Sequence, residues 1–128
     1  MAITQSTALR DAQANQVTIR VGSGTTNPNG ALAIRDGAVD AIVFQLAEPA
    51  FGAAASGVIT LLGVPIAATA IAAVTAADNF EIRNRDGATE MSGTVTGPGG
   101  GGDIEVSNTN IALNQPGSLT AGTYTNAP

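Results

Sequence analysis

Two glutamates near a predicted hairpin are the residues of this sequence best placed for acid–base chemistry. Glu81 and Glu90 flank the pair Asp86-Gly87, so their carboxylates would face each other across neighbouring strands. Paired carboxylates hydrolyse glycosides when one donates a proton and the other attacks or activates water. Arg83 and Arg85 stand close by in the chain, however, and exposed cross-strand ion pairs explain the same residues more simply. We therefore expect no catalytic residue.

Two further stretches offer ligand atoms. Asn84, Asp86 and Glu90 carry the oxygen ligands that calcium prefers, but the spaced acidic positions of an EF-hand loop are missing. The glycine-rich run at 97–102 would bind an anion through consecutive backbone N–H groups. It leads into the acidic pair Asp103 and Glu105 rather than into a helix N-terminus, so a linker between strands is the better interpretation. We expect no metal and no cofactor.

Missing residue types exclude much other chemistry. The chain has no Cys, no His and no Lys, since all five basic residues are arginines. Disulfides, thiolate nucleophiles, His or Cys metal sites, Ser-His-Asp triads and lysine-dependent phosphate loops are therefore ruled out. A net charge of −5 and a pI near 4.2 disfavour binding to a nucleic acid backbone, which requires clustered cations.

The elements that must position these residues belong to one domain, residues 1–128. We divide it into an N-terminal arm, helix and loop at 1–30 and a β-sandwich at 31–128. Aromatic residues make up only 3% of the chain, so Ala, Val, Ile and Leu must fill most of the core. Small side chains bury little apolar area each, which favours further burial against neighbouring subunits.

The clearest folding signal is the segment at 78–95. Phe80 and Ile82 alternate with Glu81 and Arg83, which is the period-2 pattern of a half-buried strand. Asp86-Gly87 then predicts a tight hairpin turn, because Gly tolerates positive φ. A second alternating run at 91–95 completes an antiparallel hairpin.

Other segments predict a helix and more strands. Ser6 is a candidate N-cap for a helix over Thr7–Gln16, and Gly22 would end the helix if it extends further. Val17–Val21 alternates and is β-branched, so helix and strand both remain open there. Short strands separated by turn residues are predicted at 32–35, 39–46, 58–62, 66–74, 104–106, 111–113 and 119–125, with Pro116-Gly117 as a turn. The expected fold is all-β: an antiparallel, jelly-roll-like sandwich of about eight strands with one short N-terminal helix.

Residues 49–77 carry no charge at all. A membrane span would need about 20 apolar residues. Gly and Pro interrupt this run, Thr recurs in it and no cation anchors either end, so we expect a buried strand pair and no membrane contact. The N-terminus lacks the basic and apolar regions of a signal peptide, which predicts synthesis in a cytoplasm.

A series of motifs then runs along nearly the whole chain. They are STALRD at 6–11, LAIRDG at 32–37, PAFGAAASGVIT at 49–60, FEIRNRDG at 80–87 with SGTV at 92–95, DIEV at 103–106 with NTNI at 108–111, and LTAGTYT at 119–125. In this order they resemble a large family of small structural proteins of tailed bacteriophages, encoded beside head genes. In that family the segment before Leu32 usually forms a longer helix, which favours helix for Val17–Val21. The family's loop before the next strand is longer than residues 37–40 here.

The resemblance implies a capsid decoration or cement protein. It would be made in the host cytoplasm and work on the exterior of the virion's capsid. Its partners would be the major capsid protein and itself, as a homotrimer, and not nucleic acid or membrane. The expected interface residues are Leu9 and Phe51 as apolar anchors, Arg10 and Arg20 as ion-pair donors, and Tyr124, although local packing or solvated charge explains each at least as well.

Two other functions remain open. One is a tail, fibre or other virion component. The other is a carbohydrate-binding adhesion module, although sugar-binding surfaces usually present several aromatic side chains and Tyr124 is the only tyrosine in a chain without tryptophan.

Overall fold

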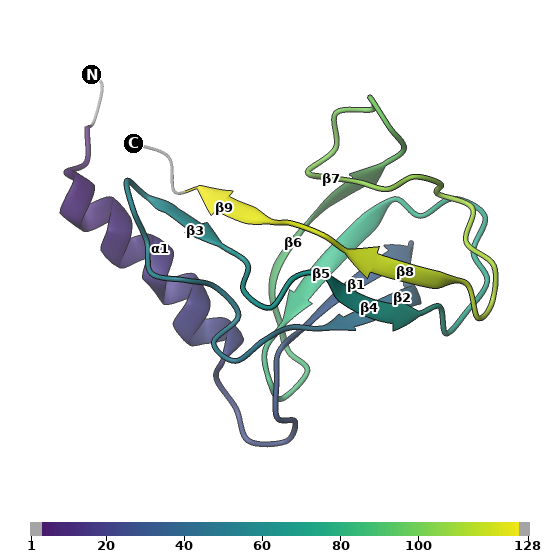
Figure 1. The fold of residues 1–128 in the computed structure, drawn as a ribbon, viewed down its shortest axis with the longest axis horizontal. Coiled ribbons are helices and arrows are strands. Elements are labelled where there is room, and N and C mark those ends of the chain that lie inside the picture. The colour runs from purple at the N-terminus through teal and green to yellow at the C-terminus, as the bar shows by residue number, and fades with distance from the viewer. Residues whose placement is uncertain (1–3, 126–128) are drawn as a thin grey trace.

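The protein is an all-β structure with one N-terminal helix in its described residues, 4–125 of the computed structural model (Figure 1). This confirms the predicted fold class, and the strands number nine. The elements are α1 (Thr7–Val21), β1 (Ala31–Asp36), β2 (Val39–Gln45), β3 (Val58–Thr60), β4 (Ile66–Thr69), β5 (Asn79–Arg83), β6 (Thr89–Thr96), β7 (Ile104–Glu105), β8 (Pro116–Leu119) and β9 (Thr123–Thr125).

The main sheet has five strands in the order β2-β1-β5-β6-β7. Its first four strands pair antiparallel, as predicted. The last pair, β6 and β7, is parallel, with Val95 opposite Ile104, which corrects the prediction of a purely antiparallel sheet. The glycine-rich loop at 97–102 leaves the end of β6 and returns the chain to a point beside Val95. Strand β7 therefore starts there and runs in the same direction as β6.

The two faces of the main sheet differ in chemistry. The alternating residues Leu32, Ile34, Ile42, Phe44, Phe80 and Ile82 are buried and belong to the hydrophobic core. The intervening positions carry Arg35, Asp40, Glu81 and Arg83, which are partly exposed. Period-2 alternation therefore separates an apolar face from a charged face, as the sequence of the hairpin predicted.

Two small sheets lie over the apolar face. Strand β8 pairs with β4 and β9 pairs with β3, both antiparallel. In Figure 1, β8 and β9 follow one another as a nearly continuous strand across the molecule. Glycines allow this close packing: a Cβ on Gly117 would lie 2.7 Å from Ile42 Cδ1, and one on Gly122 would overlap Leu61 Cδ1.

Several predicted boundaries in these small sheets are wrong. Pro116-Gly117 is the start of β8 rather than a turn, because both residues pair with β4. The single strand expected at 119–125 is interrupted at 120–122. Strand β4 ends at Thr69 instead of Val74, and the strand expected at 111–113 is only one bridge, between Val74 and Ile111.

Helix α1 extends through the segment that the sequence left open. Ser6 caps it, since its Oγ accepts a hydrogen bond from the Leu9 N–H, and Gly22 is its C-cap. Val17 and Val21 lie one turn apart on the same face, where Val21 is fully buried and Val17 packs against the core. Burial of that face outweighs the low helix propensity of β-branched residues.

The central hairpin is present, with a longer connection than predicted. Arg83 pairs with Thr89, so five residues, 84–88, join β5 to β6. Gly87 has a φ of 85°, as the turn prediction required. The Asn84 side chain is buried, and its Oδ1 accepts hydrogen bonds from the N–H groups of Asp86 and Ala88, which fixes this loop.

Candidate functional site

A four-residue charged cluster covers the polar face of β1, β2 and β5. Arg83 donates to Asp40 at 2.8 Å and to Glu81 at 2.7 Å, and Arg35 lies 2.7 Å from Asp40 and 3.2 Å from Glu81. We call these four residues the sheet cluster. Each cation contacts both anions, so the charges of the cluster cancel.

The sheet cluster bears on whether Glu81 is a catalytic carboxylate or an ion-pair partner, the two roles that the sequence offered. Hydrogen bonds from Arg83 hold the pKa values of Asp40 and Glu81 below their ordinary values. A general acid at neutral pH needs the opposite, a raised pKa. Glu81 is therefore an ion-pair member of a surface cluster, which agrees with the simpler explanation that the sequence favoured.

Glu90 has a different partner, on the helix. Arg20 donates two hydrogen bonds to its carboxylate, from Nε at 3.1 Å and from Nη2 at 2.8 Å. The Asn84 Nδ2 adds a third at 3.1 Å. These contacts lower the pKa of Glu90, Arg20 first among them. Glu81 and Glu90 thus belong to separate ion pairs. They are not directly opposite each other across the hairpin as predicted, since Glu81 lies opposite Ser92.

In the hairpin loop, the side-chain oxygens that could bind a metal accept hydrogen bonds from backbone N–H groups instead. Asp86 Oδ1 accepts hydrogen bonds from the N–H groups of Thr25 at 2.9 Å and Thr26 at 3.0 Å, which ties the loop after α1 to the hairpin. Asn84 Oδ1 is occupied in the same way. Within residues 4–125, no three acidic side chains gather as a metal site would require.

Three N–H groups of the glycine-rich loop also have internal acceptors. Gly99 N–H donates to Glu105 Oε1 at 3.0 Å and Gly102 N–H donates to Thr96 Oγ1 at 3.1 Å. Gly100 N–H donates to Gly97 O at 3.1 Å. An anion would have to displace these bonds, so the loop serves as the connection between β6 and β7.

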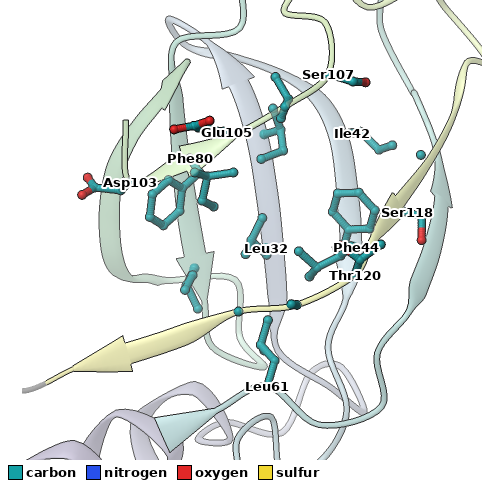
Figure 2. A pocket seen from close by; sticks show the side chains of 18 of the residues that line it. Leu32, Ile42, Phe44, Leu61, Phe80, Asp103, Glu105, Ser107, Ser118 and Thr120 are labelled. Atoms are coloured by element: carbon teal, nitrogen blue, oxygen red, sulfur yellow. The ribbon is translucent and has the colours of Figure 1, made fainter. Parts of the chain in front are cut away.

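A large hollow lies between the main sheet and the β8–β9 segment. We call it the C-terminal cavity; its volume is ≈ 990 Å³. Its floor is the apolar face of the main sheet, with Leu32, Phe44 and Phe80 at its centre, and Leu61 lies at one side (Figure 2). Residues 115–125 border it on the other side, and these carry mostly small side chains.

One border of the C-terminal cavity is polar. Residues 103–108 contribute Asp103, Glu105, Ser107 and Asn108 to its lining. Figure 2 shows Asp103 and Glu105 beside the Phe80 ring, at one end of the apolar floor. Asp103 Oδ2 accepts hydrogen bonds from the N–H of Thr94 at 3.0 Å and from its Oγ1 at 3.2 Å, so the carboxylate is held in place.

The structure distributes the five predicted interface residues over different environments. Leu9 is 47% exposed on α1, which suits an anchor, and Arg10 is half-buried on the same helix. Arg20 bonds to Glu90 of its own chain. Phe51 is only 4% exposed and belongs to the core, so as a surface anchor it is a wrong prediction: a large aromatic side chain in an aromatic-poor chain is needed inside. Tyr124, half-buried on β9, lines the C-terminal cavity.

Four exposed residues without charge form a stripe along α1. Leu9, Ala12, Gln16 and Ile19 all lie at the spacing of one helix face, and all are exposed. Leu9 and Ile19, at 47% and 58% exposure, are its large apolar members. We call these four residues the α1 stripe. It carries no charge, and α1 presents it on the side opposite the buried Ala14 and Val21.

Sequence reasoning missed Ile19 and the C-terminal cavity. Ile19 belonged to the segment left open between helix and strand, so its face was undetermined. The sequence feature that could have indicated the cavity is the small number of large side chains in residues 115–125, which lie over Leu, Ile and Phe residues of the main sheet. Recognising it required the pairing of β8 and β9 with β4 and β3, which are far away in the chain.

Comparisons with family models, with curated proteins and with solved structures found no match. In residues 4–125, the helix is neither long nor apolar enough to cross a membrane. The uncharged stretch at 49–77 contains the short strands β3 and β4 instead.

Proposed function

We propose that this chain is a structural protein of a bacteriophage virion: a capsid decoration or cement protein that binds the outer surface of the major capsid lattice and stabilises the head without catalysis. Its partners are the major capsid protein and further copies of itself, as a homotrimer. The order of motifs along the chain is the origin of the proposal. The acidic composition agrees with it, because a coat that surrounds packaged DNA must not bind that DNA.

The observation that carries the proposal is the α1 stripe. Soluble proteins tend to use exposed apolar side chains for binding other proteins, and the stripe presents Leu9 and Ile19 on one side of the helix. The stripe lies on a helix that packs against the core through Ala14, Val17 and Val21, so the surface is formed before it binds. Repetition of one modest contact over a lattice would multiply its strength.

A test uses phage particles that lack this protein, with purified protein added back. We expect added protein to cover the head in many copies and to raise the temperature at which particles release DNA. Binding to the tail in few copies would favour a tail or fibre component. Equal heat resistance with and without the protein would remove the stabilising role.

A variant pair separates the α1 stripe from general surface effects. We expect the double variant Leu9→Ser and Ile19→Ser to bind particles at least about tenfold more weakly. The control is Leu113→Ser, since Leu113 is 57% exposed but lies outside α1. Equal binding by both variants would place the capsid contact elsewhere on the molecule.

A further inference from the structure

The C-terminal cavity is large for a domain of this size. Protein interiors leave few voids wider than a water molecule, whereas small-molecule sites occupy about 300–1,000 Å³. At ≈ 990 Å³ the cavity lies at the upper end of that range. It is also separate from the proposed capsid-binding surface, because no residue of α1 lines it.

The floor of the cavity suits an alkyl chain. Leu32, Ile34, Phe44, Phe80 and Ile82 form one contiguous apolar surface on neighbouring strands of the main sheet. Each of these residues is only 2–7% exposed, so it presents only an edge to the cavity. Much of the rest of the apolar lining comes from the half-buried Met91, Ile104, Val106, Leu119 and Tyr124. An apolar ligand would replace water above them and gain van der Waals contacts that the small residues of 115–125 do not supply.

The charged groups of the cavity have one sign. Asp103 and Glu105 are the charged residues in its lining, and none of the described lining residues is an arginine. In residues 4–125 neither carboxylate forms an ion pair with an arginine, unlike Asp40, Glu81 and Glu90. Hydrogen bonds from Thr94 and from Gly99 position the two carboxylates at the same end of the floor. That end attracts a cation and repels an anion.

We infer that the C-terminal cavity binds a single-chain cationic amphiphile: an alkyl chain over Leu32, Phe44 and Phe80 that ends in an ammonium group beside Asp103 and Glu105. The apolar lining as a whole, floor edges and half-buried side chains together, provides most of the affinity, and the two carboxylates select the charge of the head. A fatty acid carboxylate of the same chain length is repelled.

The experiment compares three probes by isothermal titration calorimetry with the intact protein at low salt. They are decyltrimethylammonium below its micelle concentration, decanoate of matched chain length, and tetramethylammonium, which lacks the chain. We expect the first probe to bind at one site and to raise the melting temperature, and decanoate to bind at least about tenfold more weakly. Absence of binding by the first probe, or equal affinity for decanoate, overturns the inference, and so does equal binding of tetramethylammonium.

Three variants locate the site. Met91, half-buried, lines the cavity opposite Ile82, so Met91→Trp narrows the cavity there and should weaken binding of the cationic probe. The double variant Asp103→Asn and Glu105→Gln keeps the shape of the cavity and should weaken binding of the cationic probe about fivefold or more. Glu48→Gln removes an exposed carboxylate outside the cavity and should change nothing.

Circular dichroism must show that each variant is folded. If Met91→Trp does not fold, the double variant and its Glu48→Gln control still decide. A folded Met91→Trp protein that binds the cationic probe as well as the unaltered protein contradicts the location of the ligand in the C-terminal cavity. A double variant that binds the cationic probe unchanged contradicts the role of the carboxylates.

Discussion

Arg83 bonds to carboxylates of two strands at once, Asp40 on β2 and Glu81 beside it on β5. A guanidinium is planar and presents several N–H groups in fixed directions, so it can hold two acceptors in one geometry. Lysine, with a single ammonium, cannot reproduce this arrangement. The sheet cluster thus links β2 to β5 across the intervening strand β1, which contributes Arg35.

At the scale of the residue, we expect Arg83→Met to lower the free energy of unfolding by about 1–2 kcal/mol, because two partly buried carboxylates lose a cation. Urea denaturation measures this change. A double-mutant cycle with Asp40→Asn isolates the pair, and we expect a coupling energy of about 0.5 kcal/mol or more. Additive effects of the two substitutions would show that the ion pair contributes nothing to stability.

The sequence predicted only part of this cluster. Glu81 and Arg83 alternate with apolar residues on one strand, so their shared polar face was evident. Asp40 and Arg35 join them only because β1 lies between β2 and β5, and strand order is not visible in local periodicity. The partner of Glu90 was missed for a related reason, since Arg20 reaches it from a helix seventy residues earlier.

At the scale of the element, Gly93 lets β6 pack against its neighbours. A Cβ there would lie 2.6 Å from Phe80 Cε1 and 2.6 Å from Asp103 Oδ2. The ring of Phe80, which is opposite Gly93 in the register of β5 and β6, occupies the space that a side chain would need. The glycine is therefore required by packing and not by its φ angle.

We expect Gly93→Ala to lower the free energy of unfolding by about 1–3 kcal/mol, because the ring or the carboxylate must move. Thermal denaturation with a matched variant tests this. Gly97→Ala is the control, since a Cβ at Gly97 would meet nothing within 4 Å. Equal stability of the two variants would show that the hairpin adjusts without cost.

Elements with a local signal were predicted better than elements with remote partners. The hairpin of β5 and β6 and the capped start of α1 follow from neighbouring residues, and both are confirmed. Strand β8 follows from its pairing with β4, which overrides the turn preference of Pro116-Gly117. The C-terminal cavity depends on the same remote pairing, so local patterns gave no indication of it.

At the scale of the whole molecule, stability should depend on pH only in acid. The pKa values of Asp40, Asp78, Glu81, Asp86 and Glu90 are all lowered by hydrogen bonds in the folded state. A group with a lowered folded pKa stabilises the protein above its unfolded pKa, about 4 for carboxyls, and loses that contribution as the pH falls through the folded value.

We therefore expect the urea midpoint to stay nearly constant from pH 8 to pH 6, since the chain has no histidine, and to fall steadily below about pH 4. A series of denaturation curves from pH 2 to pH 8 measures this. A midpoint that is the same at pH 3 as at pH 7 would mean that the folded protein stabilises the charged carboxylates no more than the unfolded chain does.

The pairing of β8 and β9 with β4 and β3 also has a consequence for biosynthesis. While the ribosome is still adding residues, β3 and β4 have no partners, and the apolar floor that β8 and β9 border is open on that side. Completion of the fold must wait until β8 and β9 have been synthesised. A premature stop codon before Pro116 should therefore yield a product that aggregates or is degraded, even though it retains all five strands of the main sheet.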